Sequence, residues 1–320
     1  MIVITGCAGF IGYHLTKKLL EKKKFVLGID KIDNYYDKEL KITRIKNLKK
    51  NKKFIFKKID LNNKKKLFDL LKNKSIDYII HLAAQPGVRV SLKSPHNTLY
   101  QNINTFINVI EAVRIFKIKK FIYASSSSVY GETKTYPFIE NDKHNFPISV
   151  YGTSKICNEH IAETYAKNFK TKSVGLRFFT VYGPYGRPDM AYFSFTKNLY
   201  KDKKIVVFNK GKMHRDFTYV DDIVDGIYKI INKNIKTIHC VLNLGKGKPD
   251  KLFDLLKYLQ FHSKKKFKLS FTESIPTGDI KKTYASVKKA KKIISWKPKV
   301  NLKQGTLNFI NWYRMFYDKK

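Results

Sequence analysis

A tyrosine and a lysine four positions apart are the residues of this sequence best suited to proton transfer. Tyr151 and Lys155 fall in the segment Tyr-Gly-Thr-Ser-Lys, which we expect to lie in the first turn of a helix. Side chains at this spacing share one face of a helix, so the lysine ammonium can stabilise the tyrosine as phenolate and lower its pKa. A phenolate placed in this way is a general base. Because the spacing alone is common on protein surfaces, its interpretation depends on the surrounding segments.

A run of serines precedes this pair in the chain. Ser125–Ser128 follows the apolar segment Lys120–Ala124, which we predict to be a strand. In an open α/β sheet the carboxyl end of a strand faces the ligand crevice. The serine hydroxyls are therefore predicted to line a binding site, and a flexible loop is the alternative.

The N-terminal segment has the pattern of a dinucleotide-binding turn. Ile2–Ile4 is apolar, glycines follow at positions 6, 9 and 12, and an amphipathic helix comes next. Gly6 would permit the tight turn, Gly9 the approach of backbone to a pyrophosphate, and Gly12 the packing of helix on strand. The free N–H groups of the helix N-terminus would face the phosphates. A turn that binds nothing is the alternative.

An acidic residue follows these glycines at the distance expected of a ribose-binding carboxylate, which is about 20 residues. Asp30 ends the predicted strand Phe25–Ile29. A carboxylate there accepts hydrogen bonds from both ribose hydroxyls and repels a 2′-phosphate, so NAD is favoured over NADP. A turn or helix-cap role is the alternative for Asp30.

Strand and helix patterns alternate along the chain, which predicts an α/β fold with a doubly wound parallel Rossmann sheet. The further predicted strands are Phe54–Ile59, Ile76–His81 and Ser173–Phe178, and the predicted helices are Leu40–Leu48, Pro95–Ile115, Val150–Phe169 and Leu302–Phe316. From Thr180 onward the sequence is richer in turns. We therefore expect an NAD-binding domain over 1–179, which carries Tyr151 and Lys155, and a smaller substrate-binding region over 180–320. This boundary is soft, and the chain is free to cross back.

Lysine dominates the net charge of +40, since the 320 residues include only seven arginines. The lysines are spread along the chain without interleaved aromatics, which favours a solvated surface over a nucleic-acid-binding patch. No apolar run approaches the roughly 20 residues of a membrane span. Three scattered cysteines give neither a disulfide framework nor a metal-ligand spacing. We predict a cytoplasmic protein with no metal, no membrane insertion and no nucleic-acid partner.

Taken together, these segments resemble the extended short-chain dehydrogenase/reductase family, and within it the NAD-dependent nucleotide-sugar epimerases. The resemblance runs almost end to end, through TGCAGFIG, HLAAQPGVRVS, SSSSVYG, YGTSK, LRFFTVYGPYGRPDM and HRDFTYVDDI. It is closest to the UDP-glucuronate 4-epimerase branch. Thr180, for example, stands where galactose-type epimerases usually carry asparagine.

The resemblance implies the interconversion of UDP-glucuronate and UDP-galacturonate by transient oxidation at the sugar C4. Bound NAD would take a hydride from C4 while Tyr151, as phenolate, takes the hydroxyl proton. Lys155 would hold the ribose, and Ser126 would orient the hydroxyl. The 4-keto sugar would then rotate in the pocket, and the hydride would return to its other face.

The resemblance also implies how the chain binds its ligands. Ser127, Ser128 and Thr180 would donate to the uronate carboxylate and resist its loss as carbon dioxide. Related decarboxylases and dehydratases carry an acidic residue in the serine segment, which this chain lacks. The further substrate-binding positions are Arg187, Arg215 and Asp279. The cofactor-binding positions are Gly6, Gly9, Phe10, Ile11, Gly12, Asp30, Asp60, Leu61, Leu82, Ala83, Ala84, Tyr151, Lys155 and Phe178.

Two other functions stay open at this point. One is a 4-epimerase of UDP-glucose or UDP-N-acetylglucosamine, and the other is a non-enzymatic NAD-sensing or nucleic-acid-binding protein on the same fold. The complete set of Tyr151, Lys155 and Ser126 disfavours a pure sensor. Family members are commonly homodimers through a four-helix bundle, for which Pro95–Ile115 and Val150–Phe169 are the candidate helices here.

Overall fold

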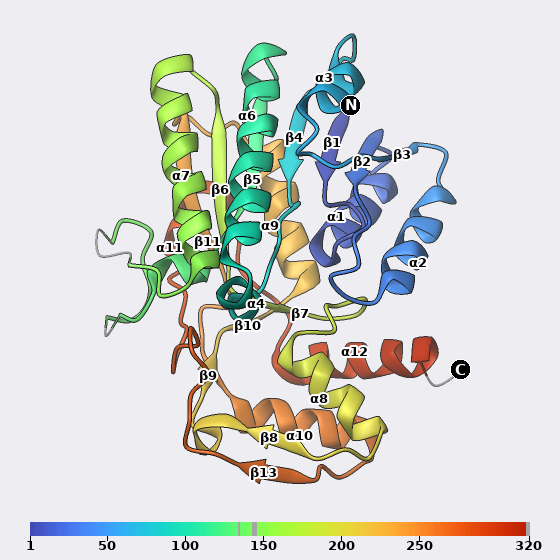
Figure 1. Cartoon of the computed structure of the whole chain (residues 1–320), viewed down its shortest axis with the longest axis vertical. Coiled ribbons are helices and arrows are strands. Elements are labelled where there is room, and N and C mark those ends of the chain that lie inside the picture. Colours follow the sequence, from blue (N-terminus) through green and yellow to red (C-terminus); the bar gives the residue numbers. More distant parts are fainter. Residues whose placement is uncertain (134, 143–145, 318–320) are drawn as a thin grey trace.

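The computed structural model describes residues 1–133, 135–142 and 146–317 (Figure 1). Within this part of the chain, one sheet has the strand order β11-β6-β5-β4-β1-β2-β3, and every neighbouring pair is parallel. Its strands are β1 (Ile2–Thr5), β2 (Val26–Asp30), β3 (Phe54–Lys58), β4 (Tyr78–His81), β5 (Lys120–Ser126), β6 (Ser173–Phe178) and β11 (His239–Leu244). The predicted doubly wound parallel sheet is confirmed.

Helices cover both faces of this sheet because successive strand residues point to opposite sides. Ile2 and Ile4 pack in one core with α1 (Phe10–Glu21), α2 (Lys38–Lys49), α9 (Val220–Asn232) and α11 (Lys288–Ile294). Val3 packs in the opposite core with α3 (Lys64–Leu71), α6 (Thr105–Ile115) and α7 (Val150–Phe169). Each face of the sheet is therefore buried.

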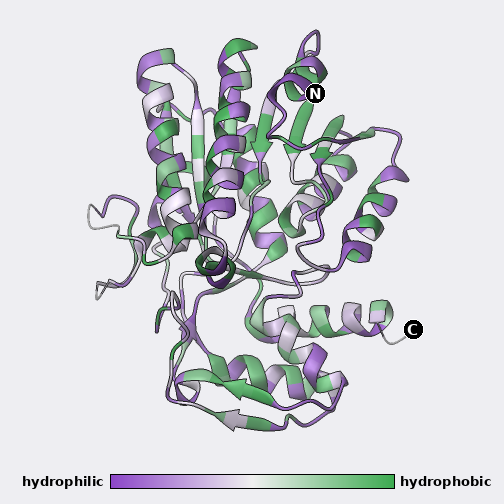
Figure 2. Cartoon of the chain, viewed as in Figure 1, coloured by the Kyte–Doolittle hydropathy of each residue, from purple (hydrophilic) through white to green (hydrophobic). Residues whose placement is uncertain are grey.

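A separate, smaller layer lies at the carboxyl ends of the strands. It contains α8 (Ala191–Tyr200), β8 (Ile205–Val207), α10 (Leu252–Ser263), β13 (Leu269–Phe271) and α12 (Leu302–Tyr317), which share a second core. Figure 1 shows these elements below the sheet, and Figure 2 shows hydrophobic residues on the helices and strands of both layers. The second half of the chain contributes to both layers, because α9 and β11 return to the sheet between α8 and α10.

Short elements connect the two layers. β7 (Thr180–Tyr182) pairs in parallel with β10 (Phe217–Tyr219), and β9 (His214–Arg215) pairs antiparallel with β12 (Asp250–Lys251). Other short helical segments are α4 (Val88–Lys93) and the 3₁₀ segments η2 (Ser127–Tyr130) and η3 (Phe208–Gly211).

The segment predicted as one helix from residue 95 to 115 is instead three pieces. These are α5 (Pro95–Leu99), the π-helical turn η1 (Tyr100–Asn104) and α6. Buried Asn102 explains the break, because its amide accepts from the Gln85 N–H at 2.7 Å and donates to the Gln85 carbonyl oxygen at 3.1 Å. Its Nδ2 also donates to Ser154 Oγ at 2.9 Å, so the wider turn ties the segment after β4 to α7.

Residues 1–133, 135–142 and 146–317 contain no helix that could span a membrane and no group of side chains that could hold a metal ion. No helix there has the length and apolar character that a membrane span requires. No three histidine, cysteine or acidic side chains there are grouped as a metal ion would need.

Candidate active site

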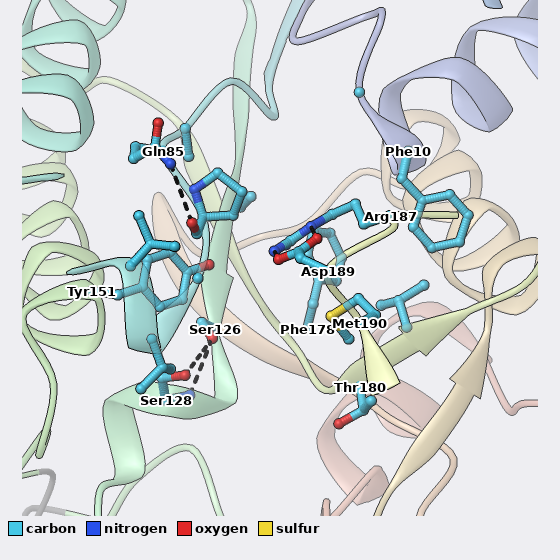
Figure 3. Close-up of a pocket in the computed structure, with 18 of the residues that line it drawn as sticks. Phe10, Gln85, Ser126, Ser128, Tyr151, Phe178, Thr180, Arg187, Asp189 and Met190 are labelled. Atoms are coloured by element: carbon cyan, nitrogen blue, oxygen red, sulfur yellow. Dashed lines mark hydrogen bonds and ion pairs between the residues drawn. The ribbon is translucent and has the colours of Figure 1, made fainter. Parts of the chain in front are cut away.

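One cavity of about 720 Å³ lies at the carboxyl ends of β1, β2, β4, β5 and β6. Every residue that the sequence predicts for the site lines this cavity, from Gly6 to Asp279. Figure 3 shows part of it, with Tyr151, Ser126 and Ser128 on one side and Arg187, Asp189 and Phe10 on the other. The fold therefore gathers the predicted positions, while the role of each stays a prediction.

The glycine turn forms a cradle of closely packed backbone at the cavity wall, to which Gly6, Gly9 and Gly12 contribute. Gly6 has a φ of +74°, and a Cβ added to it would lie 2.7 Å from the Ala83 nitrogen. A Cβ on Gly12 would lie 2.0 Å from the Gly6 carbonyl oxygen, so α1 packs closer to the turn than any side chain allows. Such a turn before a helix N-terminus suits the pyrophosphate of a dinucleotide.

Asp30 closes this cradle at the end of β2. Its carboxylate accepts from the N–H of Ala8 at 3.1 Å and from the N–H of Ile32 at 2.8 Å. Burial raises the pKa of Asp30, and these backbone donors oppose that shift. Ile32 has a φ of +52°, which is strained for a β-branched residue. Asp30 thus also holds the loop beyond β2 in place.

The first two turns of α7 carry the predicted proton-transfer pair. The hydroxyl of Ser149 caps the helix by accepting from the Gly152 N–H at 3.1 Å. Lys155 Nζ donates to the Ala124 carbonyl oxygen at 3.1 Å and lies 5.8 Å from the centre of the Tyr151 ring. Burial lowers the pKa of Lys155 to about 8.

Burial and two neighbouring side chains shift the pKa of Tyr151. Burial raises the pKa of its phenol, while the charge of Arg187 and a hydrogen bond with Ser126 lower it. From the sequence we expected Lys155 to lower the pKa of Tyr151. In the structure, burial instead disfavours the ammonium form of Lys155 itself.

Hydroxyl groups concentrate beside Tyr151. Ser126 Oγ donates to Ser128 Oγ at 3.1 Å and accepts from the Ser128 N–H at 3.1 Å (Figure 3). Ser127 lies in the same 3₁₀ turn. Thr180 begins β7, and its N–H donates to the Asp216 carbonyl oxygen at 3.1 Å. Thr180 also lines the cavity. These hydroxyls offer donors without a net charge.

An ion pair lies across the cavity from Tyr151. Arg187 Nε donates to Asp189 Oδ1 at 3.0 Å, and Nη2 donates to Asp189 Oδ2 at 2.5 Å. The Tyr35 hydroxyl donates to Asp189 Oδ2 at 3.1 Å. Burial raises the pKa of Asp189, but the charge of Arg187 and the hydrogen bonds from Arg187 and Tyr35 together outweigh it, so the pKa is lowered overall.

A second charged cluster occupies the end of the cavity near the smaller layer. Arg89 Nη2 donates to Asp279 Oδ2 at 2.8 Å, and the Arg89 guanidinium lies 5.2 Å from the centre of the Phe208 ring. Arg215 Nη1 donates to the His214 carbonyl oxygen at 3.0 Å. Burial lowers the pKa of Arg215, while the charge of Asp279 opposes that shift. Two guanidiniums against one carboxylate favour an anionic ligand.

Sequence reasoning missed several residues that line the cavity. Those with polar side chains include Tyr35, Lys41, Arg89 and Asp189. Arg89 and Asp189 lie inside segments that carry the family resemblance, which is the one signal that marks them. Tyr35 and Lys41 reach the cavity through the loop after β2 and the start of α2, and periodicity does not reveal that path.

Comparisons with known proteins agree with this geometry. The family model described as "NAD dependent epimerase/dehydratase family" matches residues 2–245. A protein of Methanocaldococcus jannaschii, named as uncharacterized, is 44% identical over 98% of this chain and 95% of its own length. A protein of Thermodesulfobacterium geofontis named UDP-glucuronate 4-epimerase is 38% identical over 97% of this chain and 95% of its own.

A solved structure is also similar over the whole chain. It is the UDP-glucuronic acid 4-epimerase from Bacillus cereus in complex with UDP-glucuronic acid and NAD. The two chains superpose with a TM-score of 0.91 at 36% identity, over 99% of each. On these grounds, the chain belongs to the NAD dependent epimerase/dehydratase family.

Proposed function

We propose that this protein is a UDP-glucuronate 4-epimerase, which interconverts UDP-glucuronate and UDP-galacturonate with bound NAD. The observation that carries the proposal is the uncharged donor cluster of Ser127, Ser128 and Thr180 in the same cavity as Tyr151. The names of the Thermodesulfobacterium geofontis and Bacillus cereus relatives support it.

The glycine turn and Asp30 fit NAD, because the turn brings its backbone to the cavity wall at a helix N-terminus in a packing that side chains on Gly6 and Gly12 would prevent. The residues that would hold it are those of the turn and of the strand ends around it: Gly6, Gly9, Phe10, Ile11, Gly12, Asp30, Asp60, Leu61, Leu82, Ala83, Ala84 and Phe178. When bound, NAD accepts a hydride from the sugar C4 and returns it to the opposite face.

In the proposed reaction Tyr151 moves the proton of the C4 hydroxyl. Its phenolate, favoured by Arg187 and Ser126, takes the proton as C4 is oxidised. The phenol gives the proton back after the 4-keto sugar has rotated in the pocket. Ser126 orients the reacting hydroxyl. Lys155 holds the cofactor ribose through its buried Nζ, whose position the Ala124 carbonyl fixes.

In this proposal the hydroxyl cluster binds the carboxylate of the substrate. A 4-keto uronate is a β-keto acid, which loses carbon dioxide most easily when the bond to its carboxylate stands perpendicular to the plane of the carbonyl group. Donors from Ser127, Ser128 and Thr180 hold the carboxylate in the plane of the sugar and oppose that loss. No acid lies between Ser125 and Gly131 to repel the carboxylate.

The diphosphate and the uridine end of the substrate are assigned to the charged cluster around Arg215. Its guanidinium and that of Arg89 provide the cations, and Asp279 is available for ribose or base hydroxyls. Arg187 lines the same cavity as this cluster and Tyr151.

The proposal includes a homodimer in the cytoplasm that acts without a nucleic-acid partner. The dimer would form through α6 and α7, where Ile107, Ile115 and Phe169 are exposed. Light scattering of the protein and of an Ile107→Lys variant measures this directly, since a dimer through α6 should weaken in the variant.

The test of the activity is anion-exchange chromatography after incubation with UDP-glucuronate and no added NAD. A UDP-galacturonate peak is expected and would show that the protein retains its cofactor. A UDP-pentose peak would mean decarboxylation and would contradict the role given to the hydroxyl cluster. If neither appears even with NAD added, the same assay with UDP-glucose and UDP-N-acetylglucosamine decides for a neutral-sugar epimerase, and salt-dependent DNA binding without turnover would favour a non-enzymatic role.

A further inference from the structure

Tyr35 meets Arg187 and Asp189, which lie about half the chain away in sequence, at the cavity wall. The Tyr35 hydroxyl, in the loop between β2 and α2, donates to Asp189 Oδ2 at 3.1 Å. Asp189 in turn accepts from Arg187 Nε at 3.0 Å and Nη2 at 2.5 Å. Figure 3 shows Arg187 and Asp189 side by side, across the cavity from Tyr151 and Ser126.

Asp189 restricts both the position and the charge of Arg187. Two guanidinium nitrogens bind its two carboxylate oxygens, and this bidentate contact fixes the plane of the guanidinium. The pair is partly shielded from water, with side chains 21% and 33% exposed. The carboxylate therefore cancels part of the field that Arg187 exerts on the other groups of the cavity.

Tyr35 fixes Asp189 because its own position is tightly bounded. A Cβ on Gly87, which has a φ of +105°, would lie 2.6 Å from the Tyr35 hydroxyl oxygen. The hydroxyl thus sits against bare backbone just before α4. A carboxylate with one hydroxyl donor and a bidentate guanidinium has little freedom to rotate.

The segment that carries the pair is anchored independently. Buried Arg44 of α2 donates to the carbonyl oxygens of Tyr185 and Gly186 at 2.6 and 3.1 Å. The same guanidinium donates to the Ala8 carbonyl oxygen in the glycine turn at 2.7 Å. The backbone before Arg187 is therefore tied to the cofactor end of the site.

We propose that Asp189 and Tyr35 are positioning residues of the reaction, an inference that rests on the proposed function. Asp189 holds the Arg187 guanidinium opposite Tyr151 and moderates its charge, and Tyr35 holds Asp189. The pair sets how strongly Arg187 favours the Tyr151 phenolate.

The charged and titratable groups around Tyr151 define what each variant should do. Ser126 of β5 contacts it, Lys155 of the same helix lies 5.8 Å from its ring centre, and Arg187 acts from across the cavity. Around Arg187 are Asp189, Tyr35 and Tyr151, with Tyr192 of α8 also within electrostatic reach. Asp189 is the acidic member of this set.

The experiment compares pH profiles of kcat/KM for the NAD-loaded protein with UDP-glucuronate. The fall of kcat/KM at low pH, the acid limb, reports protonation of the Tyr151 phenolate. Asp189→Asn keeps the size of the side chain and removes its negative charge, so Arg187 favours the phenolate more strongly and the acid limb should move to lower pH by about 0.5–1 unit. Tyr35→Phe keeps the ion pair but loosens it, and should lower kcat several-fold without moving the limb. The matched control is Tyr317→Phe, which removes a hydroxyl that donates to Asp37 Oδ2 at the same 3.1 Å but away from the cavity lining.

A double variant separates positioning from a general structural effect. In an Arg187→Gln background, Asp189→Asn should no longer move the limb, because the cation through which it acts is gone. A limb that stays in place in Asp189→Asn alone, or that moves equally in the Arg187→Gln background, would overturn the inference.

Failure of the proposed function gives a different result. In that case the parent protein does not convert UDP-glucuronate at all. The inference is then tested by titrating Tyr151 in the NAD complex through tyrosinate absorbance. The signal of Tyr151 is the difference between the parent, or Asp189→Asn, and the same protein with Tyr151→Phe added. The same downward shift in Asp189→Asn supports the positioning role, and an unchanged titration rejects it.

Discussion

The Lys155 ammonium donates to the carbonyl oxygen of Ala124 at 3.1 Å, which fixes α7 against the last residues of β5. The lysine is 2% exposed, and burial lowers its pKa from 10.5 to about 8. Below that pH the folded protein must keep a cation where water would solvate it better. The position of this side chain thus suits ligand binding better than it suits stability.

Replacement of Lys155 by methionine should stabilise the protein while it abolishes turnover. The unfolded state binds more protons than the folded state between pH 8 and 10.5, so the parent should gain stability as the pH rises through that window. At pH 7 the penalty is fully present, and the variant should be more stable by about 1–3 kcal/mol. Thermal unfolding from pH 7 to 10 measures both effects.

Lys167→Met on the exposed side of the same helix is the control, since its ammonium pairs with Glu163 at the surface. That variant should unfold with the pH dependence of the parent. A Lys155→Met protein that is less stable than the parent at pH 7 would show that the ammonium is favourable where it lies.

Tyr151→Phe should remove the proton acceptor and leave the rest of the cavity intact. We expect kcat to fall by at least about 10³-fold while NAD remains bound. Turnover is read by chromatography of the UDP-sugars, and retained NAD by its absorbance after denaturation. Near-parental turnover would exclude Tyr151 as the base.

Thr180→Ala should distinguish the uronate from a neutral sugar. If its hydroxyl donates to the carboxylate, the kcat/KM for UDP-glucuronate should fall about 10-fold or more, which corresponds to one lost hydrogen bond to a charged group. Any conversion of UDP-glucose should change much less. Equal losses on both sugars would remove Thr180 from carboxylate recognition.

Two glycines of the turn should respond differently to alanine. A Cβ on Gly12 would lie 2.0 Å from the Gly6 carbonyl oxygen, so Gly12→Ala should lower folding stability severely. On Gly9 the nearest atom, the same oxygen, is 3.0 Å away, and the turn can yield by a few tenths of an ångström. Gly9→Ala should therefore fold but lose NAD affinity. Thermal unfolding and NAD content of the purified variants test this order.

Arg44→Met should disconnect the glycine turn from the segment before Arg187. The substitution leaves the carbonyl oxygens of Ala8, Tyr185 and Gly186 without this donor. We expect a loss of about 3–5 kcal/mol in unfolding free energy, together with weaker NAD retention. Lys46→Met on the exposed face of α2 is the control and should change neither.

The sequence predicts best where the pattern is local. The glycine turn, Asp30 and the Tyr151 helix have fixed spacings, and the structure places them at one cavity. The broken helix around Asn102 is different, since the break depends on bonds to Gln85 and Ser154 that no spacing reveals. Tyr35 and Asp189 are 154 residues apart, and only the tertiary structure shows their contact.

β11 is a strand of the sheet that the hydrophobic pattern of the sequence did not predict. His239–Leu244 lies within the half of the chain that looks turn-rich, yet it pairs in parallel with β6 and completes the sheet. Its apolar character is that of any short buried segment. Its place at the edge is decided by the pairing partner that β6 leaves free.

This late strand also bears on how the chain folds during synthesis. β6 ends at Phe178 and its neighbour β11 ends at Leu244, so β6 emerges from the ribosome well before its partner. At translation rates of about 5–20 residues per second, the edge of β6 waits roughly 3–13 s for β11. An unpaired edge is a template for pairing with other chains. A nascent or truncated chain that stops near residue 179 would keep that edge open, and aggregation of such fragments is the expected result.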